Sequence, residues 1–142
     1  MKFWPAACDR GDMVRVRIGS IWHYGVYVSD DQVIQFGPPP REGTKSPEVI
    51  RVCSTTMDEF AGGSIVEKAK LTLAERLRRI PPEKTCAIAL SRIGEGGYDL
   101  LHNNCEHFAF ECVFGVKRSR QEEEARRQWE AYAAAHRSGA ED

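Results

Sequence analysis

One cysteine of this sequence lies where a nucleophile would be expected, at the start of a predicted helix. Cys105 follows two asparagines, either of which can accept a backbone N–H at a helix start, and Asn103 with Glu106 approximates a capping box. The first turn of a helix offers unpaired N–H groups and a positive dipole end, which favour a thiolate over a thiol. The alternative interpretation is a small buried residue, since free cysteines are often buried.

A thiol nucleophile needs a base that takes its proton, and histidine is the usual one. Among the four histidines, His23 is the one on a predicted core strand. His102 and His107 flank Cys105 too closely to point at it, and we interpret them as capping or surface residues. His136 lies in a polar tail. His23 is therefore the candidate general base.

A third group usually orients the imidazole, and a glutamine amide oxygen can do so. His23, Gly25 and Tyr27 share one face of a predicted strand, because residues two apart point the same way. A three-residue loop over 29–31 would pair Gly25 with Gln35, on the face of His23, whereas a two-residue loop would separate them. The sequence thus predicts a contact between His23 and Gln35.

Acyl transfer also needs donors for a developing oxyanion. We expect the backbone N–H groups of Cys105 and its helix-start neighbours to supply them, with Asn104 in support. The Tyr27 hydroxyl is a weaker candidate.

A zinc site around the cysteine is the competing interpretation of its two flanking histidines. Its fourth ligand would be Cys112, two helical turns from Cys105, or about 10 Å along the axis. That separation is too large for one ion. We expect neither a metal nor a cofactor.

Length and composition favour one domain of ordinary size in a reducing compartment. The 142 residues carry 20 basic and 21 acidic side chains, a net charge of -1 that gives no reason to expect nucleic-acid binding. The five cysteines contain no CxxC pair, which favours reduced thiols and a cytoplasmic location. The apolar stretch before Cys8 is too short for a signal peptide, and no segment is long enough to span a membrane.

The pattern along the chain predicts an α+β fold in which an antiparallel sheet packs against helices. Strands are expected over 11–18, 21–28, 32–36, 48–53 and 64–70, the first three as a meander. Helices are expected over 55–60, from a capping box at Thr72 and Glu75, over 83–93, and from Cys105 to a cap at Gly115. Residues 37–47 are expected to form a surface loop.

The tail is charged, and its segment 120–136 has the spacing of an amphipathic helix. Its narrow stripe consists of Ala125, Trp129, Tyr132 and His136. We expect this helix to lie against the domain or to fray from it.

Four motifs taken in order resemble those of the lecithin:retinol acyltransferase family. They are Gly11-Asp-Met-Val-Arg-Val16, Ile21-Trp-His-Tyr-Gly-Val-Tyr-Val28, Val33-Ile-Gln-Phe-Gly-Pro38 and Tyr98-Asp-Leu-Leu-His-Asn-Asn-Cys-Glu-His-Phe-Ala109. The resemblance covers about residues 11–120, and the Asn-Cys-Glu-His-Phe block is highly specific. It divides the chain into a lead-in at 1–10, the family domain at 11–120 and a tail at 121–142.

This resemblance implies a circularly permuted papain-like fold, in which the histidine strand precedes the cysteine helix. It also implies thiol acyl transfer, in which a cysteine takes an acyl group from a glycerophospholipid as a thioester. Cys105 falls on the family nucleophile and His23 on its general base. Animal members commonly have a second histidine where this chain has Gln35, and we expect activity to survive that difference.

Two departures from the family pattern bear on the substrate. The chain shows neither the apolar C-terminal anchor of the membrane-bound animal members nor the long insertion that marks true retinol acyltransferases. We therefore expect a compact, soluble, bacterial-type member acting on a phospholipid or another acyl ester, with transient membrane-surface contact, and not on retinoids.

Two other functions stay open. Permuted papain-like peptidases and isopeptidases have a similar order of histidine and Asn-Cys, although Glu106-His-Phe108 and Gly11-Asp12 favour the lipid family. A binding module with a degenerate site is the second alternative, because Gln35 replaces a histidine.

Overall fold

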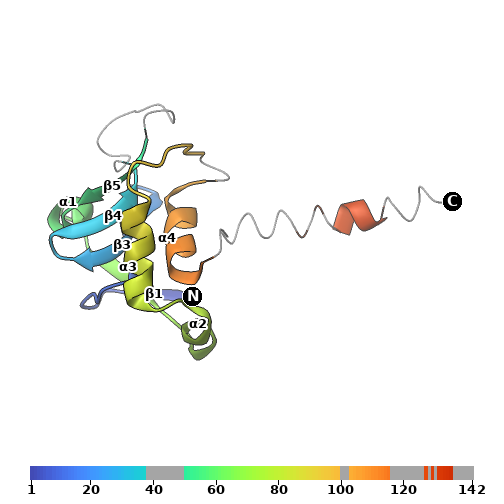
Figure 1. The fold of residues 1–142 in the computed structure, drawn as a ribbon, viewed down its shortest axis with the longest axis horizontal. Coiled ribbons are helices and arrows are strands. Elements are labelled where there is room, and N and C mark those ends of the chain that lie inside the picture. The colour runs from blue at the N-terminus through green and yellow to red at the C-terminus, as the bar shows by residue number, and fades with distance from the viewer. Residues whose placement is uncertain (38–49, 100–102, 116–126, 128, 130, 136–142) are drawn as a thin grey trace.

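The protein is described here by a computed structural model over residues 1–37, 50–99, 103–115, 127, 129 and 131–135 (Figure 1). Most of the expected loop at 37–47 lies outside these residues. The same is true of His102, Ala125 and His136. In the tail, the described residues are helical, and Trp129 and Tyr132 are exposed.

Six strands form one antiparallel sheet in the order β1-β6-β2-β3-β4-β5. They are β1 (Lys2–Trp4), β2 (Met13–Ile18), β3 (Ile21–Ser29), β4 (Gln32–Phe36), β5 (Val52–Thr55) and β6 (Val66–Lys70). The expected meander is confirmed by β2, β3 and β4, and β5 extends it. Strand β5 begins later than expected, and β1 had no counterpart among the predicted strands.

In the described residues before the tail, four helices accompany the sheet, which confirms the predicted α+β class. They are α1 (Met57–Ala61), α2 (Leu73–Arg78), α3 (Pro82–Ser91) and α4 (Cys105–Phe114). Thr72 and Glu75 form the expected capping box, and Gly115 ends α4 in the left-handed conformation. Within the described residues, no helix combines the length and the apolar character needed to cross a membrane.

The two faces of the sheet bury different clusters. Helices α3 and α4 lie side by side on one face, where Phe108, Ala109 and Cys112 pack against strand residues such as Val26 (Figure 1). On the other face, Phe60 of α1 fills a second cluster. Its sheet residues are Val14, Val16, Tyr27 and Val33. The alternation of β2 to β4 therefore decides which side chains meet which helices.

A β-bulge sets the register between β3 and β4. Tyr27 pairs with Val33 and Ser29 with Gln32, so Val28 is the extra residue on β3. The tip of the hairpin is the two-residue turn 30–31, not the three-residue loop that the sequence suggested. The turn is one residue shorter than expected, and the extra residue of the bulge compensates for this in the register. Gly25 therefore pairs with Gln35 as expected.

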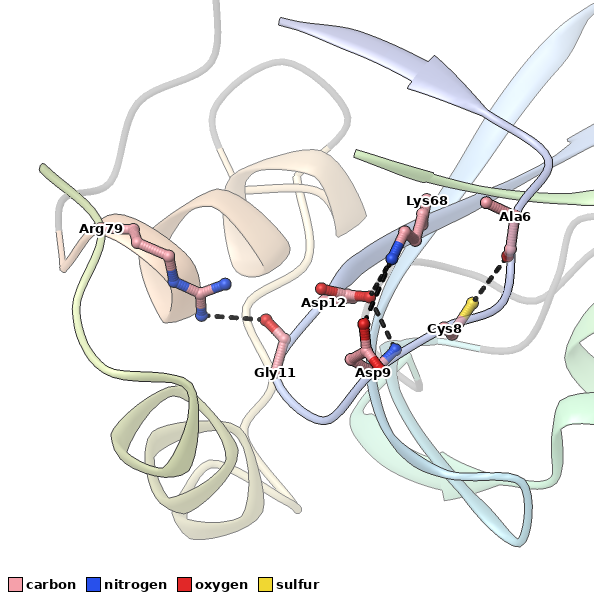
Figure 2. Close-up of polar contacts among 7 residues, drawn as sticks. All are labelled: Ala6, Cys8, Asp9, Gly11, Asp12, Lys68 and Arg79. Atoms are coloured by element: carbon pink, nitrogen blue, oxygen red, sulfur yellow. Dashed lines mark hydrogen bonds and ion pairs between the residues drawn. The ribbon is translucent and has the colours of Figure 1, made fainter. Parts of the chain in front are cut away.

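Polar contacts tie the segment before β2 to the rest of the domain (Figure 2). The Lys68 ammonium on β6 lies 3.4 Å from a carboxylate oxygen of Asp9 and 3.4 Å from one of Asp12. The guanidinium of Arg79, which follows α2, donates to the Gly11 carbonyl at 3.0 Å. These contacts hold the start of β2, and hence the strand paired with β3.

Candidate active site

His23 and Gln35 form the hydrogen bond that strand parity predicts. Nε2 of His23 lies 2.8 Å from Oε1 of Gln35, and both side chains are buried, with 3% and 4% of their surface exposed. The imidazole also packs against the Phe60 ring, with 5.4 Å between ring centroids. The ring is therefore fixed by an amide at one edge and by a phenyl group at one face.

Asn104 begins the helix that carries Cys105. Its side-chain oxygen accepts the backbone N–H groups of Glu106 at 3.0 Å and His107 at 3.1 Å, and Cys105 is the first helical residue. In return, the Asn104 N–H donates to Nδ1 of His107 at 3.1 Å. The expected position of Cys105 in the first turn is confirmed.

Two details of this helix start differ from the prediction. The capping box joins Asn104 to His107, whereas Asn103 uses its amide to donate to the Gly97 carbonyl at 3.0 Å. His107 is a capping residue, as expected, but it is fully buried and makes no surface contact. An imidazole nitrogen can accept the cap N–H as a carboxylate does, and it costs less to bury.

The Cys105 thiol is not poised as a thiolate, contrary to the expectation from its helix position. Burial raises its pKa, and the charge of Glu106 acts in the same direction. The backbone N–H groups of Tyr24, Glu106 and Cys105 itself point at the sulfur and oppose this rise without outweighing it. The helix-start donors are thus present, but the site needs a base to form the thiolate.

The contact with Tyr24 places the sulfur at the backbone of the histidine strand. His23 and Gln35 project from the face that α1 covers, whereas α4 packs on the other face. The pair of β3 and β4 residues farthest from the hairpin turn is Gly25 with Gln35, and Tyr24 is the adjacent residue of β3 beyond that pair. The sulfur of Cys105 therefore meets β3 at Tyr24, just beyond the last β3–β4 pair and next to His23 in the chain.

Tyr27 lies away from the place where the Cys105 sulfur meets β3. Its hydroxyl donates to Oδ1 of Asp30 at 2.6 Å, beside the hairpin turn. This hydrogen bond raises the pKa of Tyr27 to about 12, with burial and the charge of Asp30 contributing. The structure does not bring Tyr27 together with Cys105, and the donors near the sulfur are backbone N–H groups, that of Tyr24 among them.

Two further side chains, which the sequence did not single out, lie next to the predicted residues. Cys53 lies opposite Gln35 across the β4–β5 ladder, and Nε2 of Gln35 donates to its sulfur at 3.7 Å. The Tyr24 hydroxyl reaches the side chain of Glu106. No sequence signal could have paired Cys53 with Gln35, because the segment between their strands has no regular pattern.

Comparisons with known proteins identify relatives among acyltransferases and phospholipases. Rat lecithin retinol acyltransferase is 30% identical over 133 residues, which cover 80% of this chain. Human phospholipase A and acyltransferase 4 is 26% identical over 124 residues, or 82% of this chain and 76% of that protein. Mouse phospholipase A and acyltransferase 5 is 25% identical over 81% of this chain.

This chain spans only part of its larger relatives, 58% of the rat acyltransferase and 44% of mouse phospholipase A and acyltransferase 5. The family model for lecithin retinol acyltransferase, in contrast, matches residues 6–118, which include every residue of the candidate site. The chain therefore belongs to the lecithin retinol acyltransferase family.

Proposed function

We propose that this protein is a cysteine-dependent acyltransferase or phospholipase A-type hydrolase that acts on a glycerophospholipid or a similar acyl ester. The observation that carries the proposal is the 2.8 Å contact between Nε2 of His23 and Oε1 of Gln35. An amide oxygen only accepts, so Nε2 carries the proton and Nδ1 is the basic nitrogen of the neutral ring. The next residue, Tyr24, directs its N–H to the Cys105 sulfur.

In the first half of the proposed reaction, Nδ1 of His23 takes the thiol proton and the Cys105 sulfur attacks the ester carbonyl carbon. The tetrahedral intermediate then collapses with cleavage of the ester C–O bond. The departing alkoxide takes the proton from the His23 imidazolium and leaves as a lysophospholipid. The acyl group remains on Cys105 as a thioester.

In the second half, His23 takes a proton from an alcohol, an amine or water, whose oxygen or nitrogen attacks the thioester carbon. Cleavage of the C–S bond returns the sulfur, which recovers the proton from the imidazolium. Water as acceptor gives phospholipase activity, whereas an alcohol or an amine gives acyl transfer. One site can thus support both activities named among the relatives.

The oxyanion would form beside the sulfur, where backbone donors already point. We assign this role to the N–H groups of Cys105 and Tyr24. The side chain of Asn104 contributes indirectly, because its cap orients the first turn of α4. This assignment replaces Tyr27, whose hydroxyl is bonded to Asp30.

We further propose that the domain at 11–120 is a circularly permuted papain-like fold, with the segment at 121–142 as an appended tail. The support is the chain order, in which the base strand β3 precedes the nucleophile helix α4. Access to a phospholipid would involve brief contact with a lipid surface.

Intact-mass measurement after incubation with a short-chain diacyl phospholipid tests the proposed function. We expect one acyl adduct on the wild-type protein and none on Cys105→Ala or His23→Ala. Cys8→Ala is the matched control, since Cys8 is another half-buried free thiol, and it should acylate normally.

The same variants decide between the alternatives. Cleavage of peptide or isopeptide substrates without any acyl adduct would identify a peptidase instead. Inertness toward both substrates, with Cys105 alkylating no faster than free cysteine, would identify a binding module and contradict the proposed function.

A further inference from the structure

A directed chain of hydrogen bonds continues from the imidazole into the sheet. Nε2 of His23 donates to Oε1 of Gln35, and Nε2 of Gln35 donates to the Cys53 sulfur at 3.7 Å. The Cys53 thiol in turn donates to the Gly37 carbonyl at 4.0 Å. The chain therefore ends at a backbone oxygen, which can only accept.

Strand register builds this chain. Cys53 lies directly across from Gln35 in the β4–β5 ladder, so their side chains stand on the same face. Gly37 follows β4, and its backbone N–H bonds to the Arg51 carbonyl at 2.7 Å. Its φ is 93°, and an added Cβ would collide with the Ile50 side chain, so only glycine fits there. The position of the Gly37 carbonyl is thus set by the backbone.

We propose that Cys53 is a positioning residue that fixes the orientation of the Gln35 amide and, through it, the tautomer of His23. The proposal rests on the proposed role of His23 as the base. A thiol has one proton, and here that proton is donated in a hydrogen bond to the Gly37 carbonyl. Only the sulfur lone pairs therefore face Gln35. The amide must therefore turn its NH₂ group to Cys53 and its oxygen to His23.

The orientation matters because the two ends of an amide have opposite polarity. If the amide turned over, its NH₂ group would face Nε2 of His23, and the proton of the neutral ring would move to Nδ1. That ring could not take a proton from a thiol through Nδ1. A weak sulfur acceptor would thus decide whether the proposed base is in its active form.

A double-mutant cycle tests this role. Cys53→Ala should slow alkylation of Cys105 by iodoacetamide at neutral pH about three- to tenfold, the effect of one net hydrogen bond on an equilibrium. Cys53→Ser keeps an acceptor and a donor, and it should recover most of the rate. In a Gln35→Glu background the acceptor has two equivalent oxygens, so the further change Cys53→Ala should have little effect.

Cys86→Ala is the matched control for the loss of a thiol. Cys86 also donates to a backbone carbonyl at 4.0 Å, that of Tyr27, but it packs in the cluster on the opposite face of the sheet from Gln35. The Cys86→Ala variant should leave the His23 tautomer unchanged. An equal loss of rate from Cys53→Ala in the wild-type and the Gln35→Glu backgrounds would show a packing effect and overturn the proposal.

The ¹⁵N chemical shifts of the His23 ring provide a readout that does not depend on lipid turnover. We expect Nε2 to be protonated in the wild-type protein and in Cys53→Ser, and a mixture of tautomers in Cys53→Ala. The same single tautomer in Cys53→Ala would reject the role of Cys53 even if phospholipid is turned over. A failure of turnover with the expected tautomer shift would instead reject only the proposed function.

Discussion

Gly25 lies directly across from Gln35 in the β3–β4 ladder, on the sheet face where Gln35 bonds to His23. The two bonded side chains are diagonal neighbours on adjacent strands, a separation that long side chains can bridge. Phe60 of α1 packs closely over Gly25, because an added Cβ on Gly25 would lie 3.0 Å from its ring. Glycine at position 25 thus lets the phenyl group lie close to the strand, beside the imidazole that it packs against.

Gly25→Ala should therefore weaken both the fold and the site. The new methyl group would also lie 3.1 Å from the Ile34 carbonyl oxygen, which cannot move without disturbing the ladder. We expect a loss of about 1–3 kcal/mol in the free energy of unfolding, typical of overpacking. Urea denaturation measures this loss, and alkylation of Cys105 should slow as the imidazole is displaced.

A double-mutant cycle with Phe60→Leu separates the clash with Phe60 from the clash with the Ile34 carbonyl. Because Phe60 is fully buried, Phe60→Leu is itself destabilising, but Gly25→Ala should cost less in the Phe60→Leu background than in the wild-type protein if the methyl group acts through the ring. Unchanged stability in Gly25→Ala itself would contradict the packing argument.

Strand parity predicts the central pair of the site, although the predicted length of the hairpin loop is wrong. The alternation of β3 and β4 fixes which residues share a face, and His23 and Gln35 were correctly placed together. The loop length was not predicted, because the bulge at Val28 has no sequence signature. A two-residue turn with one bulge and a three-residue loop place the same residues of β3 and β4 on the same face of the sheet.

The protonation state of Cys105 could not be predicted in the same way. Helix position is a local property, and the sequence located the helix start correctly. Burial of the thiol depends on how α4 packs against β3, which only the tertiary structure shows. The role of Cys53 was missed for a related reason, since its pairing with Gln35 spans a segment without periodicity.

Asn104→Ala should destabilise α4 and misplace its first turn. Loss of a helix cap costs about 0.5–2 kcal/mol, and here it leaves the N–H groups of Glu106 and His107 without their acceptor. Thermal unfolding measures the stability, and iodoacetamide labelling measures the reactivity of Cys105. We expect both to fall.

Thr72→Ala is the matched control, because Thr72 also forms a capping box, at the start of α2, but α2 carries no residue of the site. It should lower the stability by a similar amount and leave the labelling of Cys105 unchanged. If both variants slowed labelling equally, the cap at Asn104 would have no specific role in the site.

Glu106→Gln should make Cys105 more reactive. The carboxylate follows the cysteine directly, and its charge contributes to the raised pKa of the thiol. Removing the charge lowers that pKa, so the pH profile of the alkylation rate should shift to lower pH. The amide still offers an oxygen to the Tyr24 hydroxyl, which limits other changes. Asp58→Asn removes an equal charge from α1 and should not move the profile, and an unmoved profile in Glu106→Gln would contradict the electrostatic argument.

The stability of the fold should fall in alkaline solution because α4 buries a second thiol. Burial raises the pKa of Cys112 from 9.0 to about 12, so between these values the folded state retains a proton that the unfolded chain has lost. The contribution of Cys112 is therefore fully present below pH 9 and is lost as the pH rises through 12, by up to about 1.4 kcal/mol per pH unit. Urea titrations from pH 8 to 11 measure the slope, which should be shallower in Cys112→Ala. Equal slopes in the two proteins would mean that Cys112 titrates alike in the folded and unfolded states.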